Sequence, residues 1–467
     1  MNFWDIDSVW TFIIQMSIIF ILILVANTIR RKVKVVRESL LPSSVIAGIL
    51  LFALKFIPFF SNWIDETFME ILTYHALGLG FVALSLKAAV KAKRPVKDGV
   101  ILNSGIITVN GYLIQAIGGL AVTIILSVTF LKDLFPAAGL LLPMGFGQGT
   151  GQALNFGNIY ETLGFENGTA FGLSVAAIGF LVACIVGVIY LNVLKRTGKL
   201  KVQEQRKEEL NDINVEVYQK DEAPISESVD KMTIQFGFIF AVYAITFAVI
   251  FGLSKLSETY LGNFGTNTLK PLFWGFNFLF GTVFAILVKK IVVILKAKGI
   301  MKHTYINNHM MERISGLFFD IMIVAGIAAI NWQDLSGILV PLLIVCAVGT
   351  FVTFTYIDFI CKKMYPEYPY EAFFSIFGML TGTASTGMIL LREIDPNYET
   401  PAAHNLVLQQ LPAILFGAPL LLLMTFGASG GLKNALIMLG IVSGLFVLYN
   451  VILFLNFYLR RRKLSKE

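Results

Sequence analysis

Charged residues are scarce in this sequence. Only 14% of the 467 residues are Asp, Glu, Lys or Arg, against about 25% in a soluble domain, while 56% are hydrophobic and the mean hydropathy is +0.75. This composition excludes an ordinary soluble domain. The Lys and Arg residues lie in short clusters between apolar runs and form no basic face with interleaved aromatic residues, so we expect no nucleic acid partner. The composition indicates a helical protein embedded in a lipid bilayer.

Cysteine and histidine are also rare. The three cysteines, Cys184, Cys346 and Cys361, follow no CxxC or zinc spacing, which excludes a disulfide framework and a cysteine metal site. The sequence has no Gly-x-Gly-Asp and no His-Glu-x-x-His motif, and no serine is matched to a histidine, so we expect neither an enzyme nor a cofactor. No Lys or Arg precedes the first apolar run, so we expect no cleavable signal peptide.

Apolar runs recur along the whole chain, and crossing a bilayer takes roughly 20 such residues. Basic clusters follow the first, third and fifth runs and close the chain. Because Lys and Arg concentrate in cytoplasmic loops, we expect the N-terminus outside and the C-terminus in the cytoplasm, in the cell (inner) membrane. The predicted spans are 9–29, 41–60, 68–86, 99–131, 168–194, 232–253, 270–289, 315–331, 337–360, 405–426 and 433–459.

This orientation inverts the two halves of the chain relative to each other. The first span runs from outside to inside, whereas its counterpart, the sixth, runs from inside to outside. We therefore predict an all-α polytopic membrane protein with two inverted five-helix repeats, each with a re-entrant hairpin, plus one extra C-terminal helix. The predicted boundaries are 1–194 for the first repeat, 195–231 for a cytoplasmic linker, 232–427 for the second repeat, and 428–467 for the extra helix and basic tail.

Two glycine-rich breaks occupy corresponding places in the two halves. The first break, GFGQGTGQA, covers 145–153, and the second break, GMLTGTASTG, covers 378–387. Dense glycine interrupts a helix, and broken backbone at bilayer depth is tolerated only where protein or a water-filled cavity satisfies its polar groups. Paired breaks indicate the binding site of a transporter. We expect the first break in a hairpin at about 136–160, entering from outside, and the second in a hairpin at about 371–392, entering from inside.

The polar groups of the two breaks form the predicted site. A helix that starts at a hairpin tip directs free N–H groups and its positive dipole end at the cavity, which suits an anion. The alternative is that these small residues only pack helices together. The predicted substrate-binding residues are Gly147, Gln148, Gly149, Thr150, Gly151, Gln152, Asn155, Thr381, Gly382, Thr383, Ser385 and Thr386.

A coupling cation is predicted at the same place. Carbonyl and hydroxyl oxygens suit Na⁺, and the predicted ligands are Thr150, Thr383 and Asp320, the last being an intramembrane acid that could equally reach cytoplasmic water. Neither break contains a carboxylate, which favours Na⁺ over proton coupling. The expected partners are a small anion, Na⁺ and the bilayer; the sequence leaves a homodimer open.

Residues 147–153, GQGTGQA, resemble the first re-entrant signature of the bacterial sodium:glutamate symporter family, which reads like GHGTGAA. The resemblance continues through YETLGFENGT at 160–169 and includes LPSSVIAG at 41–48, which is similar to the family's Pro-then-Gly opening of its second span. It covers residues 1–427. The resemblance implies two inverted five-helix halves, a re-entrant loop in each, and Na⁺-driven uptake of an acidic amino acid.

The sequence also departs from that family. Gln148 stands where the family often has His, the second break reads TGTAST instead of a GxGATPT-like run, and the span at 433–459 is an addition. These departures concern the substrate more than the fold. We therefore expect Na⁺-coupled uptake of glutamate or a related small carboxylate by alternating access. Transport of another organic anion, or ion antiport, is the alternative, and a channel or an intramembrane enzyme is less favoured.

Overall fold

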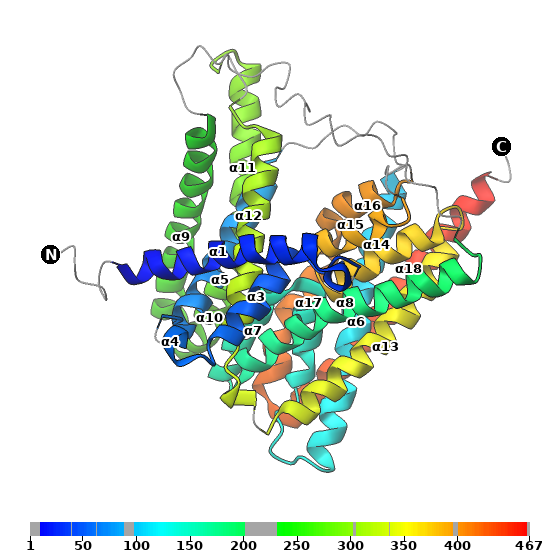
Figure 1. Cartoon of the computed structure of the whole chain (residues 1–467), viewed down its shortest axis with the longest axis horizontal. Coiled ribbons are helices and arrows are strands. Elements are labelled where there is room, and N and C mark those ends of the chain that lie inside the picture. Colours follow the sequence, from blue (N-terminus) through cyan, green and yellow to red (C-terminus); the bar gives the residue numbers. More distant parts are fainter. Residues whose placement is uncertain are drawn as a thin grey trace. The chain divides into compact units, whose positions relative to one another are not determined.

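The computed structural model describes residues 10–38, 40–61, 63–87, 98–200, 231–301, 305–335, 337–395 and 400–464 (Figure 1). Of these described residues 85% are helical, and none of them lies in a strand. Most of the predicted linker at 195–231 lies outside them.

Nine helices in the described ranges are long and apolar enough to cross a membrane. Because about 20 apolar residues span the hydrocarbon, they identify an all-α polytopic membrane protein. The nine are α1 (Thr11–Lys32), α5 (Glu66–Leu86), α6 (Asp98–Val128), α8 (Gly168–Arg196), α9 (Lys231–Phe264), α11 (Asn277–Ala297), α13 (Leu339–Met364), α17 (Gln410–Ser429) and α18 (Gly431–Leu464).

Two of the predicted spans do not correspond to any of these nine long apolar helices. The run at 41–60 is divided into α3 (Ser43–Leu54) and the short α4 (Pro58–Ser61), because Pro58 has no N–H to donate and restricts the residue before it. The run at 315–331 falls on α12 (Asn308–Ala328), whose first turns are polar. The number of spans in each half therefore stays a prediction.

Shorter helical segments connect the long helices. Three of them lie between α6 and α8, and three lie between α13 and α17. They are α2 (Lys34–Glu38), η2 (Ala138–Leu140), η3 (Pro143–Gly147), α7 (Thr150–Thr162), η4 (Gly265–Leu269), α10 (Lys270–Gly275), η5 (Gln333–Leu335), α14 (Pro369–Thr381), α15 (Ala384–Arg392) and α16 (Ala402–Leu408).

The chain forms two compact units. Unit 1 contains residues 1–69, 92–204 and 326–467, and unit 2 contains residues 70–91 and 205–325. Each unit therefore takes segments from both predicted repeats. In unit 1, helices α13, α17 and α18 all pack against α6, and both glycine-rich breaks lie in this unit.

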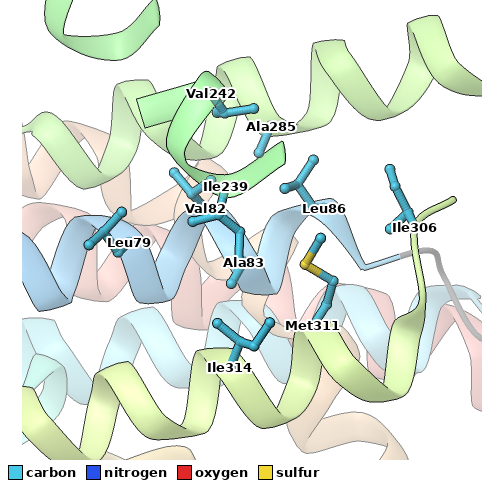
Figure 2. Packing of buried hydrophobic residues seen from close by; sticks show 10 residues of the cluster. All are labelled: Leu79, Val82, Ala83, Leu86, Ile239, Val242, Ala285, Ile306, Met311 and Ile314. Atoms are coloured by element: carbon cyan, nitrogen blue, oxygen red, sulfur yellow. The ribbon is translucent and has the colours of Figure 1, made fainter. Parts of the chain in front are cut away.

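The core of unit 2 is an apolar cluster shared by α5, α9, α11 and α12. Figure 2 shows Val82 and Leu86 of α5 facing Ile239 and Val242 of α9, with Met311 at the start of α12 closing one side. All five side chains are almost fully buried. Burying each of them contributes about 1.5–3 kcal/mol relative to water exposure, an amount that is smaller where lipid is the alternative solvent.

A glutamine makes the same contact in each unit. In unit 1 the backbone N–H of Asp65, just before α5, donates to Gln15 Oε1 of α1 at 3.3 Å. In unit 2 the backbone N–H of Asn307, just before α12, donates to Gln235 Oε1 of α9 at 3.0 Å. Each glutamine thus satisfies an N–H that precedes a helix. The spacing of buried residues also matches: Gln15, Ile19, Leu22 and Ala26 in α1, and Gln235, Ile239, Val242 and Thr246 in α9.

A lysine likewise caps a helix C-terminus in each unit. Lys55, after α3, donates to Ala328 O and Ile330 O at the end of α12, at 3.0 and 2.9 Å. Lys289 of α11 donates to Ser85 O and Lys87 O at the end of α5, at 2.7 and 2.9 Å. Carbonyls in the last turn of a helix have no partner within the helix, and a cation suits them.

Candidate functional site

The first break lies between two helical segments. Segments η2 and η3 lead to Gly149, whose φ of +81° and ψ of −171° interrupt the helix, and α7 begins at Thr150. A positive φ strains a residue with a side chain, which explains the glycine at this position. Because Gly149 has no side chain, no side chain caps the first N–H groups of α7.

The two ends of this segment lie together, so it is a hairpin. Phe135, which precedes it, stacks on Phe165, which follows it, with ring centroids 5.0 Å apart and planes at 7°. The ring of Phe135 also lies 5.9 Å from that of Tyr160 in α7. At the tip, Gly147 packs against Tyr112 and Gln115, in the middle of α6. The first hairpin therefore reaches halfway along α6 and returns.

The second break forms a shorter hairpin. Helices α14 and α15 pack against each other with Gly378 facing Gly387 across their interface. The turn between them is Gly382 and Thr383, and Leu380, just before it, packs against Gly111 of α6. Its tip thus reaches the same part of α6 as the first.

The two hairpins enter unit 1 from opposite ends. Helices α6 and α13 are antiparallel: Gln115 bonds Thr353 in the middle of both helices, whereas Ser104, near the start of α6, lies 2.6 Å from the Tyr365 hydroxyl, just after α13. The first hairpin follows the C-terminal end of α6, and the second follows the C-terminal end of α13. They therefore start at opposite ends of this antiparallel pair.

The hairpin tips meet. A Cβ atom placed on Gly149 would lie 3.9 Å from Thr383 Cγ2 and 4.0 Å from Gly382 O. Gln148 and Thr383 are half-buried, whereas Thr150 and Thr381 are fully buried. The structure thus brings the two predicted clusters together at their turns, where Gln148 and Thr383 are partly accessible.

Gln115 of α6 connects both tips and was not predicted from the sequence. Its Nε2 atom donates to Leu380 O at 2.8 Å and to Thr353 Oγ1 at 3.0 Å. Its Oε1 atom faces Gly147 and has no hydrogen-bond partner among the described residues. An amide in the otherwise apolar run LIQAI was the available sequence signal. The orphaned oxygen is an acceptor directed at the first tip.

Gln152 is the second orphaned amide. It lies in the first turn of α7, is 1% exposed, and neither its Oε1 nor its Nε2 atom has a partner in the described part of the chain. A buried amide without partners costs about 1–3 kcal/mol for each group, so such a residue calls for an explanation such as a ligand or water. Asn155, one turn further, is also buried.

The threonine hydroxyls of the second break form hydrogen bonds within the hairpin's own helices, α14 and α15. Thr381 donates to Phe377 O at 2.8 Å, as a hydroxyl in a helix often does. Thr383 is the N-cap of α15: its Oγ1 accepts from the N–H of Thr386 at 3.4 Å and lies 3.3 Å from Thr386 Oγ1. A hydroxyl oxygen has two lone pairs, so these bonds leave acceptor capacity.

Thr150 packs closely against the last turn of α12. A Cβ placed on Gly326, in the last turn of α12, would lie 2.5 Å from the Cβ of Thr150. Gly326 therefore leaves space for Thr150 at the first tip. Any larger residue at position 326 would have to displace it.

The role of Asp320 as a Na⁺ ligand stays a prediction. Asp320 is exposed on the part of α12 that belongs to unit 2, while both hairpins belong to unit 1. The side chain of Ser385 lies outside the described ones. Among the described residues no group of three or more His, Cys, Asp or Glu could hold a metal ion. The oxygen atoms near the hairpins that suit Na⁺ are therefore those of backbone carbonyls, hydroxyls and side-chain amides.

The entrance to the second hairpin is acidic. Burial raises the pKa of Glu371, in the first turn of α14, and the negative charge of Asp395 raises it further. Asn405 donates to the hydroxyl of Tyr368 at 3.0 Å and so joins the start of this hairpin to α16.

No model of a known protein family and no curated protein sequence matches this chain.

Proposed function

We propose that this protein is a secondary active transporter that couples Na⁺ to the uptake of glutamate or a related small carboxylate by alternating access. It works in the cell (inner) membrane with its N-terminus outside and its C-terminus in the cytoplasm. It is not an enzyme, and its substrate leaves chemically unchanged. The resemblance of 147–153 to the sodium:glutamate symporter signature supports this class.

The observation that carries the proposal is the pair of hairpins whose tips meet. In a membrane they are re-entrant loops from opposite faces, each broken by glycine near mid-depth. Irregular backbone at that depth needs protein or water around it, and transporters place their sites at such paired breaks. A channel is less favoured because two tips in contact close the path that a pore requires.

The proposed architecture is two inverted repeats of five helices with one additional helix, α18. The matched contacts of the two units support it. Gln15 accepts a hydrogen bond from the backbone N–H just before α5, and Gln235 accepts one from the backbone N–H just before α12. Lys55 caps the end of α12, and Lys289 caps the end of α5. If a pseudo-twofold axis relates the repeats, every contact between an element of one half and an element of the other occurs a second time with the halves exchanged. The contact of Lys55 with α12 and the contact of Lys289 with α5 form such a pair.

The chemistry at the tips fits a small anion and Na⁺ as the two transported species. The N-terminus of α7, which no side chain caps, offers N–H groups and a positive dipole end to a carboxylate. Gln152 supplies an unpartnered donor and acceptor beside it. The carbonyl of Gly382 and the hydroxyls of Thr150 and Thr383 are neutral oxygens of the kind that hold Na⁺.

Uptake by purified protein in proteoliposomes tests the function. We expect labelled glutamate to accumulate only when Na⁺ outside exceeds Na⁺ inside, and to be recovered unmodified. Equal uptake with Na⁺ and with K⁺ would contradict coupling to Na⁺. A competition panel of glutamate, aspartate, citrate and neutral amino acids identifies the carboxylate; competition by none of the acids would refute the substrate class.

A further inference from the structure

An apolar groove lies beside α18, remote in sequence from both breaks. It has a volume of about 920 Å³, and its walls come from α18, including Phe446, Val447, Val451 and Tyr458, with Lys363 of α13 at its edge. Val447 and Val451 are 61% and 49% exposed. The groove belongs entirely to unit 1.

A polar contact joins α13 to α18 at Asn450, one of the residues that line the groove. The Tyr356 hydroxyl of α13 donates to Asn450 Oδ1 at 3.0 Å, and Asn450 Nδ2 donates to Phe446 O at 2.8 Å. The rings of Tyr356 and Phe446 lie 5.2 Å apart. These contacts pack α13 against α18 beside the groove, whose lining is mostly apolar.

Lys363 gives the groove one charged end. It is exposed, and no described carboxylate pairs with it, whereas its neighbour Lys362 binds Asp358 at 2.6 Å. Three arginines, at 460–462, follow Tyr458 in the sequence. In the proposed orientation this end meets the cytoplasmic leaflet, which carries anionic lipid.

We propose that the groove binds one anionic phospholipid, with its phosphate at Lys363 and an acyl chain along Val447 and Val451. Charge and shape select this occupant: a hydrocarbon chain lies along the apolar walls, and the headgroup phosphate meets the ammonium of Lys363. Basic sites between helices at the cytoplasmic side take such headgroups. The inference depends on the membrane orientation but not on the transported substrate.

Native mass spectrometry of the purified full chain tests this site. The protein is titrated with phosphatidylglycerol, with phosphatidylcholine of the same chains, and with inorganic phosphate. We expect Lys363→Gln to weaken phosphatidylglycerol binding about fivefold, Lys363→Arg to retain it, and phosphate alone not to bind. Lys298→Gln, an exposed lysine of unit 2, is the charge control and should have no effect.

A second pair of variants tests the groove itself. Val451→Trp fills it and should weaken both lipids, whereas Leu436→Trp, on the same helix and also 49% exposed, should weaken neither. Unchanged phosphatidylglycerol binding in Lys363→Gln or in Val451→Trp overturns the proposal. So does a dimer that Val451→Trp dissociates without loss of lipid, because the occupant would then be a second copy of the chain.

Discussion

Both hairpin turns depend on a glycine, Gly149 because of its backbone conformation and Gly382 because of close packing. Gly149 has a φ of +81°, which residues with a side chain rarely adopt. At Gly382 a Cβ would lie 3.0 Å from Thr386 Oγ1, the hydroxyl at the start of α15. Each residue therefore permits a turn that brings its tip to the other.

We expect Gly149→Val and Gly382→Val each to abolish transport while the protein still reaches the membrane. Valine adds strain of about 1–3 kcal/mol at a positive φ and obstructs the contact between the tips. The measurement is uptake normalised to the amount of protein in the vesicles. Gly440→Val is the control, since a Cβ there meets nothing within 4 Å, and it should keep most of the activity. Loss of transport from only one of the two breaks would refute a shared site.

At the scale of elements, the lysine caps provide a test of the repeat. Lys55 and Lys289 each donate to two carbonyls at a helix end, and Lys55 also pairs with Glu66. Bonds from a charged donor are worth about 1.5–3 kcal/mol each when both partners are partly buried. If the halves are repeats, both lysines should stabilise the protein through their helix caps, and Lys55 has an additional ion pair.

We therefore predict that Lys55→Met and Lys289→Met each lower the free energy of unfolding by about 2 kcal/mol, with the larger effect at Lys55 because of Glu66. Unfolding in a denaturing detergent titration, followed by circular dichroism, measures both. Lys290→Met is the matched control, since Lys290 is exposed beside Lys289. A large effect at one lysine with none at the other would argue against equivalent roles.

At the scale of the whole molecule, orientation decides which hairpin faces which side. The exposed residues Asp65 and Asp133 precede α5 and follow α6, and exposed Lys363 lies in the last turn of α13. The positive-inside rule places the first two outside and the third in the cytoplasm. Opposed re-entrant hairpins require that Asp133 and Lys363 lie on different sides.

Labelling of single cysteines with an impermeant maleimide measures this arrangement. Cys184, Cys346 and Cys361 are buried and would be replaced to remove any background. We expect Asp65→Cys and Asp133→Cys to react in intact cells, and Lys363→Cys and Glu209→Cys to react only after permeabilisation; Glu209 lies outside the described residues. Reaction of Asp133→Cys only after permeabilisation would reverse the orientation.

Sequence alone determined the class of protein and the places of the two breaks. Both follow from local properties: apolar runs of sufficient length partition into lipid, and glycine at 145–151 and 378–387 interrupts a helix whatever surrounds it. The hairpins at 138–162 and 369–392 lie close to the predicted 136–160 and 371–392. The division between α3 and α4 at Pro58 also has a local cause, the missing N–H of proline. The hydrophobicity of residues 41–60 by itself predicted one continuous span.

Only the tertiary structure decided which residues meet. Gln115 contacts Thr353 and Leu380, more than 200 positions away, and no local periodicity specifies such a pair. For the same reason the sequence did not indicate that Thr383 is used as a helix cap, or that the compact units each combine segments of both halves. Long-range packing selects among many pairings that are equally compatible with the same apolar helices, and the contact of the two tips is one outcome of that selection.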